Sequence, residues 1–298
     1  MPILFSSAEY TYMSGFLCEP RGLRAGQFSF VRYPNQELHV EIQSAVAGEH
    51  CLILGSLAPP DSQMVSLLLL AHTLRKEGAK RITGLLPYLA YAREDKIKPG
   101  RSLGTAWLGG LLQAATFDEI WTVDAHSEHD HELLPLPLKS LSPAPIFGNC
   151  LEKHGLADAS FVAPDEGARA RCEAIRSAAG ATSANIVWFE KERTDGGIVH
   201  HDRIGQVRRR AVIVDDVLDT GATLTSACER LVTAGVVELY VCVTHGLFTG
   251  QRWRDLWSLP LKHIFCTDTI PACSRLEDPR ITTLPVSPLL RTQLGSIL

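Results

Sequence analysis

Short apolar runs alternate with longer amphipathic segments in the first half of the chain. Residues 50–54 form an apolar run of strand length, whereas residues 62–76 place their apolar side chains at the spacing of a helix. Gly78 follows that segment, at a position typical of the residue that ends a helix. A second apolar run, 81–86, then stops at Pro87. The pattern predicts a strand, a helix and another strand joined by short connections.

The second half of the chain repeats this alternation. The pattern predicts a β-branched strand at 210–214, a helix at 222–233 that closes before Gly235, and a further strand at 237–243. A spacing of 157 residues separates Gly78 from Gly235. Strand–helix–strand units with short connections predict an α/β fold with mainly parallel, Rossmann-like sheets.

Length and composition add a domain count and exclude several classes of protein. At about 150 residues per domain, 298 residues predict two domains, which we place at 1–145 and 146–298. A net charge of −4 argues against bulk binding to a nucleic acid polymer. The apolar stretch 64–71 is far shorter than the roughly 20 residues that cross a membrane. Eight cysteines without a Cys-x-x-Cys pair favour reduced thiols, so we expect a cytoplasmic protein without a membrane or signal segment.

The stretch 212–225, Val-Ile-Val-Asp-Asp-Val-Leu-Asp-Thr-Gly-Ala-Thr-Leu-Thr, carries the strongest chemical signal. The predicted strand ends at Asp215 and Asp216, and a turn over 219–223 leads into the next helix. Ligands of parallel sheets bind at the carboxyl ends of strands, and a helix N-terminus favours a phosphate. The two carboxylates suit ribose hydroxyls or a Mg²⁺ shell. The stretch predicts a ribose phosphate site, although any one of these residues could simply cap the helix.

This stretch resembles the phosphoribosyl pyrophosphate (PRPP) motif of type I phosphoribosyltransferases and of ribose-phosphate pyrophosphokinases, the PRPP synthases. The motif alone does not separate the two families. Further segments resemble the synthases and occur in the order of that family: 33–37, 87–96, 123–126, 163–167, 190–193, 244–246 and 267–271. The chain therefore resembles a PRPP synthase, which implies two phosphoribosyltransferase-like domains, the first for ATP and the second for ribose 5-phosphate.

The resemblance implies transfer of the pyrophosphoryl group of Mg²⁺-ATP to the C1 hydroxyl of ribose 5-phosphate, giving PRPP and AMP. It implies catalytic roles for Arg93, His126, Lys191 and Arg193, and ATP contacts from Tyr33, Asn35, Glu37, Arg93, Glu94 and His126. It implies ribose 5-phosphate contacts from Asp215, Asp216, Asp219, Thr220, Gly221, Ala222 and Thr223. The implied metal ligands are His126 and Asp165, with Asp124 less favoured. In the family, the 33–37 element reaches a neighbouring subunit, which implies a homo-oligomer, either a dimer or a multiple of dimers.

Several of these residues also suit the chemistry by their own placement. Arg93 can supply a planar phosphate clamp, and Asp124 and His126 alternate after a predicted strand at 119–123. Lys191 and Arg193 are two apart on an extended segment, so they point the same way. The segment 194–198 after them predicts either a lid or an ordinary hairpin loop. The histidines at 126–131 and 200–201 do not have the spacing of a closed zinc site.

The chain departs from the synthase pattern directly after His126. Residues 128–133 replace a family segment that helps to form an allosteric site for phosphate and ADP, so we do not expect that regulation here. Two other functions stay open: a non-catalytic regulatory homologue, and a phosphoribosyltransferase or PRPP-sensing repressor. Retention of His126, Asp165 and Lys191 favours the enzyme. A repressor would need a basic DNA-binding segment, and none is apparent in the sequence.

Overall fold

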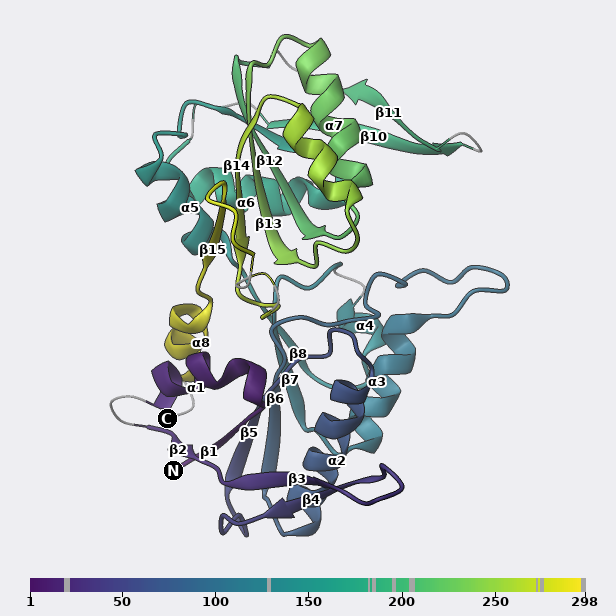
Figure 1. Cartoon of the computed structure of the whole chain (residues 1–298), viewed down its shortest axis with the longest axis vertical. Coiled ribbons are helices and arrows are strands. Elements are labelled where there is room, and N and C mark those ends of the chain that lie inside the picture. Colours follow the sequence, from purple (N-terminus) through teal and green to yellow (C-terminus); the bar gives the residue numbers. More distant parts are fainter. Residues whose placement is uncertain are drawn as a thin grey trace. The chain divides into compact units, whose positions relative to one another are not determined.

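The computed structural model describes residues 1–18, 22–127, 130–181, 183, 186–194, 197–203, 207–271, 273 and 276–295, with the backbone alone at 190–194 and 197–203. The chain forms two compact units, Met1–Leu141 with Ser287–Leu298, and Ser142–Val286 (Figure 1). Among the described residues, no helix is long and apolar enough to span a membrane.

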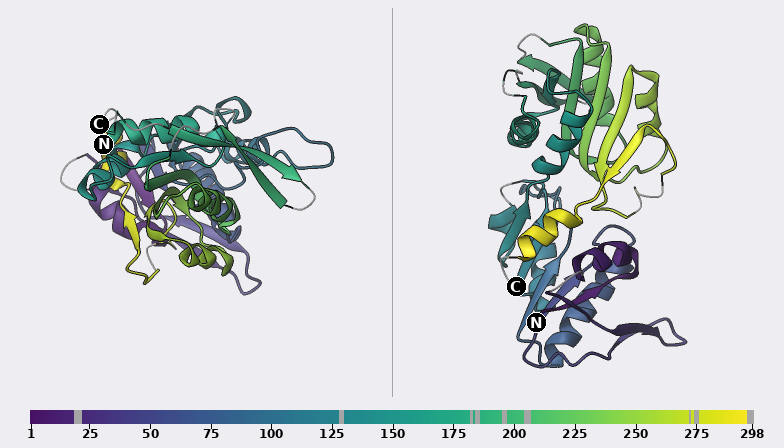
Figure 2. Two further views of the ribbon diagram at one scale, coloured as in Figure 1. Left: turned by 90° about the horizontal axis from the view of Figure 1, so that it is seen from above. Right: turned by 90° about the vertical axis from the view of Figure 1, so that its left-hand side faces the viewer.

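Unit 1 is built around a parallel sheet. Its elements are β1 (Ile3–Ser6), α1 (Thr11–Cys18), β2 (Arg24–Ala25), β3 (Phe28–Arg32), β4 (Leu38–Ile42), β5 (His50–Leu54), α2 (Ser62–Lys76), β6 (Arg81–Leu85), α3 (Gly104–Ala114), β7 (Glu119–Val123), α4 (Asp130–Leu133), β8 (Leu138–Leu141) and α8 (Ser287–Leu294). The described strands run in the order β2-β1-β5-β6-β7-β8, all parallel. The antiparallel pair β3 and β4 forms a separate hairpin, which projects from the sheet (Figure 2).

Unit 2 repeats this plan. Its elements are α5 (Ala144–Lys153), β9 (Ser160–Ala163), α6 (Arg169–Ala178), β10 (Ile186–Thr194), β11 (Gly197–Arg203), β12 (Arg210–Leu218), α7 (Ala222–Thr233), β13 (Glu238–Gly246), β14 (Leu261–Thr267) and β15 (Ile281–Leu284), with short 3-10 helices at Glu166–Ala168 and Arg252–Ser258. The described strands run in the order β11-β10-β9-β12-β13-β14-β15, and the pair β10–β11 is antiparallel. When β11 is left out, both sheets follow the same strand order, in which the second strand lies outside the first and the others follow in chain order.

The sheet of unit 2 is covered on both faces. Helices α5 and α6 lie on one face and α7 on the other (Figure 1). Val212, Val214 and Cys242 pack toward α5 and α6, whereas Ile213 and Val241 pack toward α7. Burial on both faces is the arrangement expected for parallel strands, and it explains why these strands are almost continuously apolar.

The helices that follow β5 and β12 end as predicted. Gly78 and Gly235 adopt φ values of +91° and +94°, a left-handed conformation that glycine reaches without the Cβ clash. The Gly78 N–H donates to the carbonyl oxygen of Arg75 at 3.0 Å, and the Ala79 N–H donates to that of Leu74 at 3.0 Å. These bonds satisfy carbonyl groups that the end of α2 would otherwise leave unpaired.

Three limits differ clearly from the predicted ones. Strand β12 continues to Leu218, not Val214, and β13 to Gly246, not Val243, because the ladder between them extends to the pair Leu218–Gly246. At the end of the chain, α8 belongs to unit 1, whereas 146–298 was assigned to the second domain. Leu290 and Leu294 of α8 are buried, and Arg291 lies 3.9 Å from the ring centre of Phe16 in α1. This apolar face joins α8 to α1.

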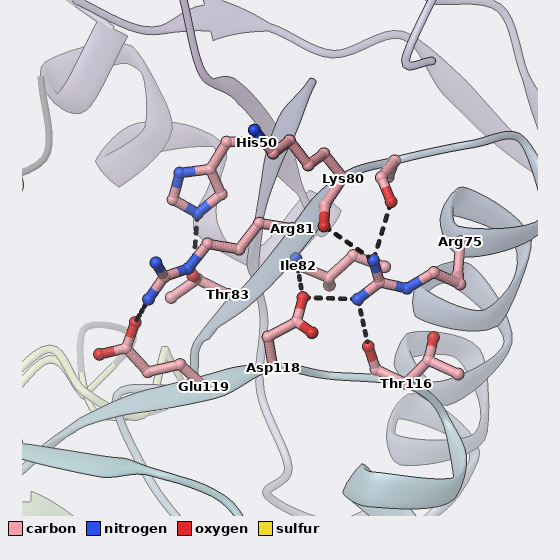
Figure 3. Close-up of polar contacts among 10 residues, drawn as sticks. His50, Arg75, Lys80, Arg81, Ile82, Thr83, Thr116, Asp118 and Glu119 are labelled. Atoms are coloured by element: carbon pink, nitrogen blue, oxygen red, sulfur yellow. Dashed lines mark hydrogen bonds and ion pairs between the residues drawn. The ribbon is translucent and has the colours of Figure 1, made fainter. Parts of the chain in front are cut away.

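A network of ion pairs holds the amino ends of the strands in unit 1 (Figure 3). The Arg75 guanidinium, at the end of α2, contacts the Asp118 carboxylate at 2.5 Å, and Asp118 also accepts the backbone N–H of Ile82 at 2.6 Å. Arg81 pairs with Glu119 at 2.7 Å across β6 and β7. The network joins α2 to the starts of two neighbouring strands, with each charge facing an opposite one.

Candidate functional site

The loop between β12 and α7 forms a cradle at the carboxyl end of the sheet in unit 2. Gly221 adopts a φ of +86°, and a Cβ atom there would lie 2.8 Å from the Trp253 Cα. Both the backbone conformation and the close approach therefore require glycine. The Gly221 carbonyl accepts the Thr225 N–H at 2.8 Å, which starts α7. Thr220 is exposed and Asp219, Ala222 and Thr223 are partly exposed, so the loop is accessible at a helix N-terminus that favours an anion.

Carboxylates gather directly before this loop. Asp215 is partly exposed and Asp216 is buried, with an exposed fraction of 7%. The Asp216 N–H donates to Asp215 Oδ1 at 2.9 Å. Burial raises the pKa of Asp215 well above its ordinary value, and the negative charges of Asp216 and Asp165 raise it further. The structure thus brings together three sequence-predicted residues, and it disfavours the ionised form of Asp215 among them.

One residue near this cluster was not predicted. The guanidinium of Arg171, on α6, lowers the pKa of Asp215 and so opposes the effect of the neighbouring carboxylates. The sequence signal that could have found it is its position: Arg171 lies six residues after Asp165, in the helix that follows the same strand end. A cation at this point can offset part of the negative charge.

Asp165 is positioned by its own turn. It follows β9 and caps the short helix Glu166–Ala168, with Asp165 Oδ1 accepting the Ala168 N–H at 3.1 Å. In the described part of the chain, no three His, Cys, Asp or Glu side chains form a ready-made metal cage. The donor set nevertheless fits a hard cation: clustered carboxylate oxygens suit Mg²⁺, which keeps several waters and usually takes one or two protein carboxylates plus substrate phosphates.

Lys191 and Arg193 lie on β10, in the antiparallel hairpin with β11. Their backbones pair with His200 and Ile198, respectively. Both residues thus lie two positions apart on a strand, the backbone setting that the sequence predicts for them. Of the segment 194–198, which was predicted to be a lid or a hairpin loop, residue 194 ends β10 and residues 197–198 begin β11. Residues 195 and 196 lie outside the described residues.

In unit 1, the segment after β6 is held by the start of α3. Ala90 and Ala92 are buried, whereas Arg93 is exposed and Glu94 partly exposed. The Thr105 hydroxyl donates to the Ala92 carbonyl at 3.1 Å, and the Thr105 N–H donates to the Glu94 carbonyl at 3.4 Å. The segment is therefore fixed through its backbone, which leaves the Arg93 side chain on the surface.

Asp124 and His126 follow β7 on a sharply turned segment. Both are partly exposed, and Asp124 has a φ of +52°, a left-handed conformation that aspartate tolerates better than most residues. The fully buried Asp130 accepts the Ser127 N–H at 3.2 Å, and burial raises the pKa of its carboxyl group. The charges of His126 and Asp95 also act on Asp130, so both side chains lie within electrostatic range of that carboxyl group. Residues 128 and 129 lie outside the described residues.

The predicted ATP contacts at 33–37 occupy the tip of the β3–β4 hairpin. Tyr33 is half exposed, and its ring lies 4.6 Å from that of His39. The Glu37 N–H donates to Asn35 Oδ1 at 3.1 Å, and the Tyr33 N–H donates to the Glu37 carbonyl at 2.9 Å. This tip belongs to the separate two-stranded sheet, apart from the strand ends that carry Arg93 and His126.

Comparison with known proteins identifies the family. Residues 3–115 match the model of the N-terminal domain of ribose phosphate pyrophosphokinase, and residues 189–297 match the phosphoribosyl synthetase-associated domain. The ribose-phosphate pyrophosphokinase of Cereibacter sphaeroides is 32% identical over 273 residues, covering 89% of this chain and 81% of the relative. The chain belongs to the ribose-phosphate pyrophosphokinase family. The enzyme of that name from Bacillus subtilis is 29% identical over 273 residues, covering 90% of this chain and 85% of the relative.

A solved structure agrees with the fold. The phosphoribosylpyrophosphate synthetase from Mycobacterium smegmatis has a TM-score of 0.86 at 23% identity, covering 99% of this chain and 98% of that one. The predicted α/β class with two mainly parallel sheets is therefore confirmed, as is the predicted family. Membership of the ribose-phosphate pyrophosphokinase family also identifies the chain as an enzyme of that type and does not favour the regulatory or phosphoribosyltransferase alternatives.

Proposed function

We propose that this chain transfers the pyrophosphoryl group of ATP to the C1 hydroxyl of ribose 5-phosphate, giving PRPP and AMP. The observation that carries the proposal is the β12–α7 loop, where the N-terminus of α7, which favours an anion, follows Asp215 and Asp216 after a short turn. The loop, Asp219 to Thr223, would hold the 5-phosphate through backbone N–H groups and hydroxyls. The two carboxylates would accept hydrogen bonds from the ribose hydroxyls.

The transfer forms one bond and breaks one. The C1 oxygen bonds to the β-phosphorus, the bond from that phosphorus to the oxygen bridging to the α-phosphate breaks, and AMP leaves with that oxygen while the hydroxyl proton is released. Phosphoryl-type transfers depend on positioning and charge neutralisation. We assign that neutralisation to Arg93, Lys191 and Arg193, and the adenine contacts to Tyr33, Asn35 and Glu37, with Glu94 beside the nucleotide phosphates.

We propose Mg²⁺ as the divalent cation, with His126 and Asp165 as protein ligands and Asp124 as a less favoured one. When bound, Mg²⁺ would offset the negative charge of the phosphates. The carboxylate cluster around Asp215 supports this choice, since a hard cation would offset the burial and the neighbouring negative charges that raise the pKa of that group. All eight cysteines are free thiols, which supports a reducing, cytoplasmic compartment.

An assay of purified protein with ATP, ribose 5-phosphate and Mg²⁺ tests the proposal. We expect AMP and PRPP in equal amounts, with AMP formation dependent on the sugar phosphate. Lys191→Ala should lose turnover, whereas Lys153→Ala, a surface lysine on α5 in the same unit, should not. If the purified protein forms no sugar-dependent AMP, the proposed enzyme activity is refuted, and the non-catalytic regulatory homologue becomes the favoured function.

We also propose a homo-oligomer, a dimer or a multiple of dimers, because the exposed hairpin tip at 33–37 projects from unit 1 (Figure 2). Mass photometry of the full chain tests this point, and a single peak at 32.7 kDa would contradict it.

A further inference from the structure

The connection from β13 to the 3-10 helix Arg252–Ser258 contacts the sugar-phosphate loop of unit 2. Three consecutive N–H groups of this connection donate hydrogen bonds to the end of β12 and the start of the loop: Leu247 and Phe248 to the Leu218 carbonyl at 2.9 and 3.0 Å, and Thr249 to the Asp219 carbonyl at 3.1 Å. The connection thus holds the loop at the point where the chain leaves the sheet.

The loop has a second support in Trp253, at the start of that 3-10 helix. A Cβ atom on Gly221 would lie 2.8 Å from the Trp253 Cα and 3.1 Å from its Cβ, so the two residues are in close contact. Gly221 is the residue that directly precedes α7. Trp253 therefore supports the loop where the chain enters the helix.

Aromatic packing joins these two points of support. The ring centres of Phe248 and Trp253 lie 4.9 Å apart at an interplanar angle of 66°, an edge-to-face arrangement that aromatic pairs favour. The Arg254 guanidinium lies 4.6 Å from the centre of the Trp253 ring. The exposed fraction of Trp253 is 2%, so its side chain acts from within the unit and not as a surface that a ligand reaches.

The backbone of Phe248 is held in a strained conformation. Its φ is +50°, a left-handed value that is unfavourable for a bulky residue. A Cβ atom on Gly246 would lie 2.4 Å from the Phe248 ring, so the ring lies directly against the end of β13. Such strain persists only where surrounding contacts enforce it. The enforcing contacts include the hydrogen bond to Leu218 and the ring of Trp253.

We propose that Trp253 is a positioning residue for sugar-phosphate binding, which holds the loop at 219–223 in its phosphate-binding conformation without touching the ligand. The inference rests on the proposed function. Without the indole ring, Phe248 loses its aromatic partner and is free to leave the strained conformation. The N–H groups of the connection then shift against the carbonyls that they hold. The 3-10 helix also loses the buried ring that keeps its first turn against Gly221.

Steady-state kinetics test the proposal through a split between KM and kcat. The 5-phosphate takes no part in the reaction, so its contacts are equally strong in the ground state and in the transition state. Weakening them raises the KM for ribose 5-phosphate and leaves kcat unchanged. Trp253→Ala should therefore raise this KM by about twofold to tenfold, the effect of losing one aromatic pair. The KM for ATP should stay unchanged, because the adenine contacts are assigned to unit 1.

Two further variants separate positioning from a general loss of stability. Trp253→Phe keeps an aromatic ring and removes only the indole N–H, which has no hydrogen-bond partner in the described part of the chain, so it should keep the wild-type KM. Trp257→Ala removes another indole from the same 3-10 helix, whose ring centre lies 3.9 Å from the Arg280 guanidinium. It should lower the melting temperature, as Trp253→Ala does, and leave the KM unchanged. If Trp253→Ala does not fold, Phe248→Leu removes the other ring of the pair and carries the same expectation.

Direct binding makes the test independent of turnover. Calorimetric titration of the full chain with ribose 5-phosphate should give a Kd that rises in Trp253→Ala and not in Trp253→Phe or Trp257→Ala. An unchanged KM and Kd in Trp253→Ala would overturn the proposal, as would an equal rise in either of the other two variants. If the wild type binds ribose 5-phosphate but forms no AMP, the proposed function fails while the Kd values still decide the role of Trp253. A wild type that binds no ribose 5-phosphate would overturn both.

Discussion

Charged residues are arranged in opposite ways at the amino end of the sheet in unit 1 and at the carboxyl end of the sheet in unit 2. In unit 1, Arg75 faces Asp118 and Arg81 faces Glu119, so opposite charges alternate (Figure 3). In unit 2, burial and the negative charges of Asp216 and Asp165 raise the pKa of Asp215, with Arg171 as an opposing cation. Paired charges contribute to stability, whereas gathered like charges cost stability unless a ligand binds them.

The comparison indicates which of the two regions is able to bind a ligand. The amino-end network already satisfies its polar groups, so it has little to gain from a ligand. Sugar hydroxyls or a cation would stabilise the Asp215 cluster, because they would place hydrogen-bond donors or a positive charge beside its carboxylates. The difference between the two regions therefore separates residues that hold the fold from residues that we expect to act.

The largest effect is expected from Asp215→Asn. The substitution removes a charged acceptor for a ribose hydroxyl, worth about 2 kcal/mol, or roughly thirtyfold in kcat/KM. The same change should raise the melting temperature of the protein in metal-free buffer, because it removes a like charge from the cluster. Initial rates of AMP formation and thermal unfolding measure the two effects. A loss of both activity and stability would show that Asp215 is simply structural.

Asp118→Ala should lower stability and leave activity unchanged, the opposite of what we expect for Asp215→Asn. It leaves the buried N–H of Ile82 without its acceptor and frees Arg75, which should cost about 1–3 kcal/mol of unfolding free energy. Because the network lies at the amino end of the strands, kcat/KM per folded molecule should stay unchanged. Denaturant unfolding gives the first quantity. Arg81→Ala is the matched control: its exposed pair with Glu119 should contribute less than about 1 kcal/mol.

The smallest expected effect is on the pH dependence of stability. Burial and the nearby Arg81 lower the pKa of His50, whose Nε2 lies 2.9 Å from Thr83 Oγ1. The unfolded chain then binds the proton more tightly, so stability is complete above about pH 6.5 and falls as the pH drops through the lowered pKa. His50→Gln should flatten this decline in unfolding experiments between neutral and mildly acidic pH.

Asp215 should show the reverse sign in the same measurement. Its pKa is raised, so its cost to stability grows as the pH rises above the ordinary aspartate value. The stability difference between Asp215→Asn and the wild type should therefore widen from acidic to neutral pH. A constant difference would mean that Asp215 does not titrate within the cluster.

Local pattern was enough to predict several elements. The strand at His50–Leu54 and the helices Ser62–Lys76 and Ala222–Thr233 have the predicted bounds, because apolar period and a terminal glycine encode each of them within a few residues. The position of the phosphate loop after a buried strand followed from the same local rules. The roles of Lys191 and His126 came from the resemblance to the family and stay predictions.

Features that depend on distant contacts escaped prediction. Strand β12 runs past Asp215 because β13 continues to pair with it, and α8 packs in unit 1 because α1 presents a complementary apolar face. Sequence spacing alone does not encode such approaches.

The order of residues along the chain thus specified the α/β class, most strand and helix limits and the loop chemistry, since each depends on periodicity and on neighbours in sequence. Folding in three dimensions was needed to bring Asp165 and Arg171 to Asp215 and to return the last helix to the first unit. These outcomes depend on burial and on charges from separate segments, whose energies exist only after the segments have packed.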